Sequence, residues 1–177
     1  MVNFNWKRPL QNQVSEYKWG YIKLVPESNL VNTLIENRER YYEFFSSLDS
    51  NMLSYVYAPG KWTIREILLH IIDTERIFTY RILCFLRGEL QSLPGYDDVV
   101  YNQNSFANTR TIKSLMDEYV SVRNATISLL NNIDESCINN VGTANGSKST
   151  VLELAYMIAG HEIHHLNVIK ERYLKQV

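Results

Sequence analysis

The sequence predicts an all-α protein, and two observations support this. Alternating apolar and polar residues, which are typical of strands, are scarce, and the chain has only 7 glycines and 4 prolines. Two capping boxes, Thr63-x-x-Glu66 and Thr150-x-x-Glu153, each precede a long segment with helical periodicity. The 177 residues are enough for one domain with a sizeable core, so residues 1–177 are expected to form a single domain.

The first part of the chain is expected to hold an arm and one helix. Residues 1–26 are predicted to be an extended arm that packs over the bundle as a strap, because Pro9 and Pro26 punctuate aromatic residues spaced through polar ones. Apolar residues then recur at helical spacing, which predicts the first helix at Ser28–Leu48. Residues 50–62 are a connection that ends with a Pro-Gly turn.

Three more helices are expected after this connection. The second begins at the first capping box and continues to about Arg87, and it is apolar around much of its circumference. Residues 88–108 lack periodicity and predict a long loop or crossover. The third helix is expected at Thr111–Asn132, a turn at residues 142–147, and the fourth helix from the second capping box to about Leu174.

Composition excludes several classes of function. The net charge is −1, so no long-range field indicates nucleic acid or an anionic membrane as a partner. No apolar run reaches the roughly 18–20 residues that a membrane span needs, and the first residues do not resemble a secretory signal. The two cysteines, Cys84 and Cys137, form no disulfide framework. These features predict a cytoplasmic protein in a reducing compartment.

The histidines point to a candidate metal site. Three of the four histidines lie in the segment from Gly160 to His165. His161 and His165 are four residues apart, which places them about 40° apart on one face of a helix. His70 lies on the second helix, and antiparallel second and fourth helices would bring the three imidazoles to about the same level. Although a single histidine pair can arise by chance, this arrangement predicts a divalent-metal site made by His70, His161 and His165.

Several short motifs together resemble those of the DinB-like (DinB/YfiT) metalloenzyme superfamily, in particular its DinB-2 subgroup. The matching segments are Arg8-Pro9, Glu16-Tyr17, Pro59 to Glu66, His70 to Arg76, Arg87-Gly88-Glu89, Leu93 to Asp97, and Gly160 to His165. They run almost from end to end of the chain, and their combination is more specific than any one of them.

The resemblance implies a fold, a metal and a kind of chemistry. It implies a four-helix bundle with a long crossover between the second and third helices, in an up-down-down-up order. It implies a divalent ion, most often nickel or zinc with iron or manganese as alternatives, held at the positions of His70, His161 and His165. Some relatives are S-transferases that use bacillithiol, mycothiol or glutathione, others are isomerases of thiol conjugates, and dimers are common.

The expected function is therefore that of a metal-dependent enzyme, a transferase or a hydrolase. We expect a metal-bound thiolate from a low-molecular-weight thiol to attack a small electrophile, because three histidines leave a coordination position open. Asp73 is the candidate that would orient an imidazole. Trp62 and Tyr101 are candidates for the mouth of the site.

Two other functions remain open at this stage. The metal could be structural or part of a non-catalytic stress protein that binds metal or small molecules. Alternatively, His161-Glu162-x-x-His165 matches the H-E-x-x-H signature of zinc peptidases, in which the glutamate is the general base. The downstream ligand pattern of those enzymes is missing, so Glu162 is expected at the surface of the fourth helix. His164 is about 100° from His165 and about 60° from His161 around the helix axis, so it is expected to flank the site rather than to bind the metal.

The last expectation is a homodimer formed by apolar helical surface. Several large apolar residues lie beyond the expected inward faces, and contiguous uncovered apolar surface usually marks an interface. These residues are Tyr42, Phe44, Phe85, Leu129 and Tyr156. A monomer covered by its own arm and long loop is the alternative.

Overall fold

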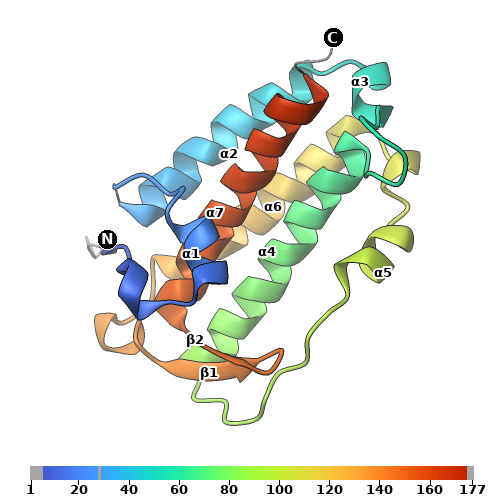
Figure 1. Cartoon of the computed structure of the whole chain (residues 1–177). Coiled ribbons are helices and arrows are strands. Elements are labelled where there is room, and N and C mark those ends of the chain that lie inside the picture. The colour runs from blue at the N-terminus through green and yellow to red at the C-terminus, as the bar shows by residue number, and fades with distance from the viewer. Residues whose placement is uncertain (1–5, 28, 175–177) are drawn as a thin grey trace.

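Four long helices form the body of the protein (Figure 1). The computed structural model describes residues 6–27 and 29–174. The bundle helices are α2 (Leu30–Ser47), α4 (Ile64–Leu86), α6 (Ile112–Leu130) and α7 (Val151–Val168). The smaller elements are α1 (Glu16–Ile22), α3 (Ser50–Ser54), α5 (Asp98–Gln103), the 3-10 turns Gln11–Gln13, Ala107–Thr109 and Glu135–Cys137, strands β1 (Val141–Ala144) and β2 (Ser147–Thr150), and a π-helical turn Ile169–Tyr173. The predicted helical bundle is confirmed, and one small hairpin is added to it.

The order of the helices is up-down-down-up, as expected. The connection after α4 climbs back along the side of the molecule, so α6 runs parallel to α4, while α7 runs antiparallel to both (Figure 1). Each bundle helix packs against two others, and α4 and α7 are neighbours. The antiparallel pairing of α4 and α7 is what brings their histidines to one level.

Side-chain caps explain where α4 and α7 begin. At α4 both halves of the capping box form, since the Thr63 N–H donates to Glu66 Oε2 at 2.7 Å and the Glu66 N–H donates to Thr63 Oγ1 at 3.2 Å. At α7 the Glu153 N–H donates to Thr150 Oγ1 at 3.0 Å. The Glu153 carboxylate does not complete a capping box as Glu66 does, and it pairs with Lys18 Nζ at 2.5 Å. The second cap thus fixes the helix start and also ties α1 to α7.

The N-terminal arm packs over the bundle as predicted, but it is not extended throughout. Residues 1–5 and Ser28 lie outside the described residues, while the rest of the arm contains the helix α1, whose N-cap is Ser15. α1 lies against α7, where Gly160 permits close approach because a side-chain carbon there would overlap the Tyr21 carbonyl oxygen. The sequence suggested an extended strap because this short helix has no long apolar stripe.

The long loop and the hairpin are joined to each other. The Leu93 N–H donates to the Thr143 carbonyl at 2.9 Å, and the Asn145 N–H donates to the Leu93 carbonyl at 3.0 Å. The hairpin turns at Asn145 and Gly146, which both have positive φ, as two-residue hairpin turns with the Asn-Gly sequence do. These bonds hold the segment around Pro94 beside the lower half of α4, next to the candidate site.

Two residues that were expected to form apolar surface belong to the core. Phe85 is 2% exposed and Tyr156 is 1% exposed, so neither can contribute to an interface between subunits. Phe85 packs where Gly142 leaves room in β1, and the Tyr156 hydroxyl donates to the Trp6 carbonyl at 2.7 Å. Tyr42 remains partly exposed, and the homodimer itself stays a prediction.

Among the described residues, no helix is long and apolar enough to cross a membrane.

Candidate metal centre

The bundle brings His70, His161 and His165 together. His70 comes from α4, and the other two come from consecutive turns of α7. The His70 and His161 Nε2 atoms are 3.1 Å apart, and the His161 and His165 Nε2 atoms are 3.0 Å apart. One ring nitrogen of each of the three residues lies within 4.8 Å of the other two. The same nitrogen of each imidazole therefore points to one common centre.

This donor set fits a divalent ion. Bonds of about 2.0–2.1 Å at tetrahedral angles place two ligand nitrogens about 3.3–3.4 Å apart, close to the separations between the His Nε2 atoms. The cluster contains three imidazoles and no thiolate, which suits zinc or nickel and leaves at least one coordination position for water or a substrate. The described residues offer no fourth protein ligand within the group.

Burial keeps the three imidazoles neutral, which is the form that binds a metal. Desolvation lowers the pKa of His70 to about 4. It lowers the pKa of His165 to about 3, with the neighbouring His70 and His164 acting in the same direction. The pKa of His161 is also lowered well below its usual value, first by burial and then by the other three histidines. Protons therefore compete weakly for these nitrogens near neutral pH.

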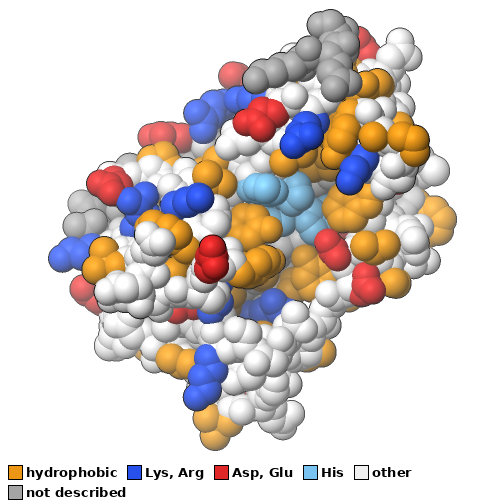
Figure 2. Space-filling view, viewed as in Figure 1, with side chains coloured by type: hydrophobic (Ala, Val, Ile, Leu, Met, Phe, Trp, Pro, Cys, Tyr) orange, Lys and Arg blue, Asp and Glu red, His pale blue; other side chains and the backbone are white. Residues whose placement is uncertain are grey.

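The cluster opens into a cavity of about 510 Å³. Figure 2 shows the histidines recessed in a hollow near the centre of one face, with hydrophobic side chains around them. The cavity walls come from α1, α4, α7, the hairpin and the segment before α5. The arm supplies α1 and the long loop supplies the segment before α5, so the cavity is complete only when both are in place.

Aromatic side chains surround the imidazoles. Trp62 packs beside His70 with ring centroids 5.0 Å apart, which places this predicted mouth residue in the cavity wall. The ring centroid of Tyr21 from α1 lies 5.7 Å from that of His161, and the ring centroid of Phe78 from α4 lies 6.4 Å from it. Tyr21 was not predicted as a site residue, although the four-residue spacing of Tyr17 and Tyr21 was a signal that both could share one face of a helix.

His164 flanks the cluster without joining it. Its ring centroid lies 5.3 Å from that of Tyr21 and 5.1 Å from that of His165. It does not belong to the converging group formed by His70, His161 and His165. This matches the position that its angle on the helix predicts.

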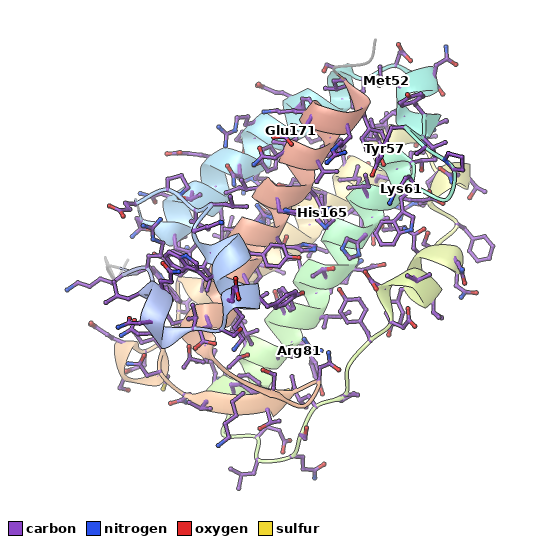
Figure 3. All side chains as sticks on the ribbon, viewed as in Figure 1. Met52, Tyr57, Lys61, Arg81, His165 and Glu171 are labelled. Atoms are coloured by element: carbon purple, nitrogen blue, oxygen red, sulfur yellow. The ribbon has the colours of Figure 1, made fainter. Side chains whose placement is uncertain are left out.

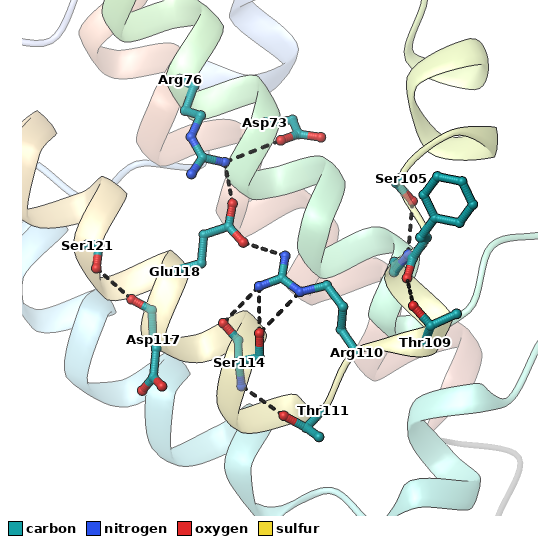
Figure 4. Close-up of polar contacts among 12 residues, drawn as sticks. Asp73, Arg76, Ser105, Thr109, Arg110, Thr111, Ser114, Asp117, Glu118 and Ser121 are labelled. Carbon is teal, nitrogen blue, oxygen red and sulfur yellow. Dashed lines mark hydrogen bonds and ion pairs between the residues drawn. The ribbon is translucent and has the colours of Figure 1, made fainter.

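Asp73 borders a small hollow together with His70, but its carboxylate is engaged by another residue. Its carboxylate pairs with Arg76 at 3.5 Å, and Arg76 also pairs with Glu118 at 2.5 Å in a network between α4 and α6 that Arg110 completes (Figure 4). Within residues 6–27 and 29–174, no hydrogen bond joins Asp73 to an imidazole. Tyr101 packs against Tyr96 at 5.2 Å and borders a separate small hollow rather than the main cavity.

The expectation that Glu162 lies at the surface is wrong. It is 1% exposed, and it faces the bundle interior, where its carboxylate accepts hydrogen bonds from Arg123 at 2.7 and 3.2 Å and from the hydroxyl of Tyr119. Arg123 is fully buried and also holds Glu75 at 2.8 Å. A glutamate committed to this network cannot serve as the general base that the peptidase signature requires, so this geometry argues against the peptidase reading.

Similarity to known proteins agrees with this fold. The sequence model of the DinB superfamily matches residues 33–169. A protein of Oceanobacillus iheyensis, provisionally named a metal-dependent hydrolase, is 28% identical over 132 residues, which cover 72% of this chain and 74% of that protein. YfiT from Bacillus subtilis, described as a probable metal-dependent hydrolase with an unusual four-helix bundle topology, has a TM-score of 0.72 at 15% identity and covers 96% of this chain and 94% of its own. The likeness to YfiT shows a shared fold, and the family match, which confirms the resemblance of the motifs, shows that the chain belongs to the DinB superfamily.

Proposed function

We propose that this protein is a metal-dependent enzyme that activates a small nucleophile, preferably a low-molecular-weight thiol, for attack on an electrophilic small molecule. The observation that carries the proposal is the convergence of three neutral histidine Nε2 atoms at the edge of an open cavity. A structural zinc site is usually closed by four protein ligands, whereas a catalytic site keeps one position open.

The residues have distinct roles in this proposal. His70, His161 and His165 would hold a divalent ion, which supplies Lewis acidity and lowers the pKa of a bound thiol or water. Trp62, Tyr21 and Phe78 surround the imidazoles and limit the access of bulk water to them. The remaining cavity accommodates the second substrate.

The carboxylates of the two helices that carry the histidines favour a thiol over water as the nucleophile. The two carboxylates nearest to the histidines along α4 and α7 are engaged, because Glu162 binds Arg123 and Asp73 pairs with Arg76. Neither is placed to take a proton from water. A thiol ionises near pH 8.5 without help, so it needs less assistance from a protein base than water does.

Hydrolysis is the second candidate, because both relatives above carry names of metal-dependent hydrolases. In that case the exposed Asp98, which borders the cavity, is the carboxylate placed to assist a water molecule.

The two reactions separate in one experiment. Protein purified without an affinity tag is loaded with zinc or nickel, and metal content is measured. Thiol consumption is then followed with an aryl halide and several thiols, and hydrolysis is followed in parallel with a panel of esters and amides. Metal-dependent thiol consumption that is lost in His161→Ala supports the transferase. Turnover confined to the esters or amides supports the hydrolase, and full metal loading without either reaction indicates a binding protein.

A further inference from the structure

Arg81 is a buried cation in the wall of the cavity that has no acidic partner. Its side chain lies on α4 and is only 8% exposed. Among the described residues its guanidinium donates one hydrogen bond, to the Pro94 carbonyl at 3.1 Å, and no carboxylate pairs with it. Asp98 borders the same cavity but forms no ion pair with Arg81 in this part of the chain. An arginine has five N–H donors, so most of its binding capacity is unused.

Of the other three buried cations in the described residues, two are held by carboxylates, and the third lies away from the cavity. Arg123 is held by Glu75 and Glu162, and Lys18 is held by Glu153 and the Lys148 carbonyl at 2.6 Å. Arg65 donates to the hydroxyls of Ser50 and Ser54, and its buried Nε has no partner, but it does not border the cavity. Burial lowers the pKa of Arg81, which shows that its surroundings disfavour the charge that it carries. A buried charge without a partner is costly, so a bound anion would relieve this cost.

The fold holds Arg81 in a fixed orientation. The bridge between Leu93 and Ala144 fixes the segment that contains Pro94, whose carbonyl receives the guanidinium. The guanidinium carbon lies 5.9 Å from the centre of the Phe78 ring. Asn145, Ser147 and Ser149 of the hairpin border the same cavity and add neutral hydrogen-bonding groups. Such a preorganised arginine with polar neighbours is typical of a carboxylate site.

The position of Arg81 relative to the histidines suits one extended ligand. Phe78 is a neighbour of both groups, since its ring centre is 5.9 Å from the Arg81 guanidinium carbon and 6.4 Å from the centre of the His161 ring. The two groups are therefore at most about 12 Å apart, the sum of these distances. Figure 3 shows Arg81 toward the hairpin end of α4, whereas His165 lies in the last turn of α7, away from the hairpin. A molecule of a few carbon atoms can reach from one to the other.

We propose that Arg81 binds a carboxylate of the substrate at the end of the cavity opposite the three histidines, and that the protein therefore acts on small carboxylic acids. As a statement about the reaction, this rests on the proposed function above. The carboxylate belongs either to the thiol or to the electrophile that it attacks. Arg81 is a specificity residue in both cases, because it fixes the far end of the ligand and leaves the other end at the histidines.

The first experiment tests Arg81 without any metal. Metal-free protein is titrated with alkanoates from butanoate to octanoate and with the matching neutral amides, and binding is followed by NMR chemical shifts. We expect the carboxylates to bind roughly 10- to 100-fold more tightly than the amides, as a charge-assisted pair in a sheltered site does. Arg81→Met should abolish this preference and Arg81→Lys should keep part of it. Arg87→Met, which changes an exposed arginine at the end of the same helix, should retain it.

The second experiment tests whether one ligand can bind at both ends of the cavity, with its thiol at the metal and its carboxylate at Arg81. Cobalt-loaded protein is titrated with mercaptocarboxylates from mercaptoacetate to mercaptohexanoate and with their amides, and the near-ultraviolet thiolate-to-cobalt charge-transfer band reports binding. We expect the carboxylate preference only in chains long enough to reach Arg81. If an alkanoate and a neutral thiol bind together without competing, the carboxylate belongs to the electrophile; if they compete, it belongs to the thiol.

The outcomes separate the two proposals. Equal binding of alkanoates and amides by wild-type protein, or an unchanged preference in Arg81→Met with an intact circular dichroism spectrum, would overturn the role of Arg81. The absence of a thiolate band with every thiol, alongside a normal carboxylate preference in the first experiment, would instead overturn the thiol reaction and leave the carboxylate site standing.

Discussion

At the scale of single residues, neighbours on one helix turn are predicted to differ sharply in metal binding. His165→Ala should remove the ion, because its Nε2 lies 3.0 Å from that of His161 in the converging group. His164→Ala should retain it, because this ring packs against Tyr21 outside the group. Elemental analysis after dialysis measures both variants. Full metal content in His165→Ala, or its loss in His164→Ala, would contradict the assignment.

Glu162 is predicted to contribute to stability rather than to proton transfer. Glu162→Gln weakens a buried ion pair with Arg123, so we expect the free energy of unfolding to fall by about 1–3 kcal/mol. Burial raises the pKa of Glu162, and the neighbouring Arg123 opposes this shift. Urea unfolding measures the loss, with the exposed Glu171→Gln as the matched control.

The opposite pattern would revive the peptidase reading. That reading requires Glu162→Gln to abolish a hydrolytic activity while leaving the midpoint of urea unfolding unchanged.

The sequence was sufficient to select the three histidines but not to orient their neighbours. Helical spacing and antiparallel packing select His70, His161 and His165, because the geometry of one helix face depends only on position. The same rule could not show that Glu162 is buried, since α7 is covered on nearly all sides, by α1 as well as by the bundle. Arg123 was also missed, because burial of a charge depends on partners from other helices.

At the scale of elements, the docking of α1 on α7 is predicted to depend on Gly160. A methyl group at this position would overlap the backbone carbonyl of Tyr21, so Gly160→Ala should push α1 away and lower stability by about 1–3 kcal/mol. Because α1 forms one wall of the cavity, the same variant should weaken ligand binding. Urea unfolding and the alkanoate titration measure the two effects.

Gly20 provides the matched control for this prediction. It lies within α1, and nothing is close to the position of its missing side chain. Gly20→Ala should therefore stabilise the protein by about 0.5–1 kcal/mol through helix propensity. Equal effects of the two substitutions would show that the close contact at Gly160 is unimportant.

The four bundle helices were predictable as elements, but the parts that close the cavity were not. α4 begins at its predicted cap because Thr63 and Glu66 are local partners. α1 and α5 are short, and short helices are stabilised mainly by tertiary contacts such as the ion pair of Lys18 with Glu153 and the bond from Asn102 to the Glu66 carbonyl. Such contacts join distant parts of the chain, so local sequence patterns do not reveal them.

At the scale of the whole molecule, the histidine cluster is predicted to make the metal-free protein sensitive to acid. The pKa values of His70 and His165 fall to about 4 and about 3, below the value of about 6.5 expected in the unfolded chain. The unfolded state therefore binds more protons below pH 6.5. The contribution of these histidines to the free energy of unfolding is complete above this pH and is lost as the pH falls toward 4. Urea unfolding between pH 7.5 and 4.5 measures the loss.

His70→Gln is the variant that tests the cause of this acid sensitivity. This substitution should reduce the slope of the free energy of unfolding against pH, because it removes one of the groups that resist protonation in the folded state. An identical slope in wild type and variant would place the acid sensitivity elsewhere in the protein.

The last prediction is that two copies pair through the face formed by α4 and α6. Tyr80 and Leu83 of α4 are 56% and 40% exposed, and the 3.6-residue helical repeat places Leu83 on the side of α4 away from His70 and Arg81. Val122 and Ala125 of α6 border a shallow groove beside Thr79 on the same face. Exposed apolar surface of this kind favours twofold pairing, and it leaves the cavity of each copy open.

Light scattering at micromolar concentration tests this pairing. We expect a mass about twice the 20.7 kDa of one chain, unchanged by a reducing agent because the contact does not use cysteine. Leu83→Glu should shift the mass toward one chain, since it places a charge at the centre of the apolar face. Leu10→Glu should leave the mass unchanged, because Leu10 is 62% exposed in the N-terminal arm rather than on this face. A mass near 20.7 kDa for the wild-type protein would show that it is a monomer, and equal effects of the two substitutions would place the interface elsewhere.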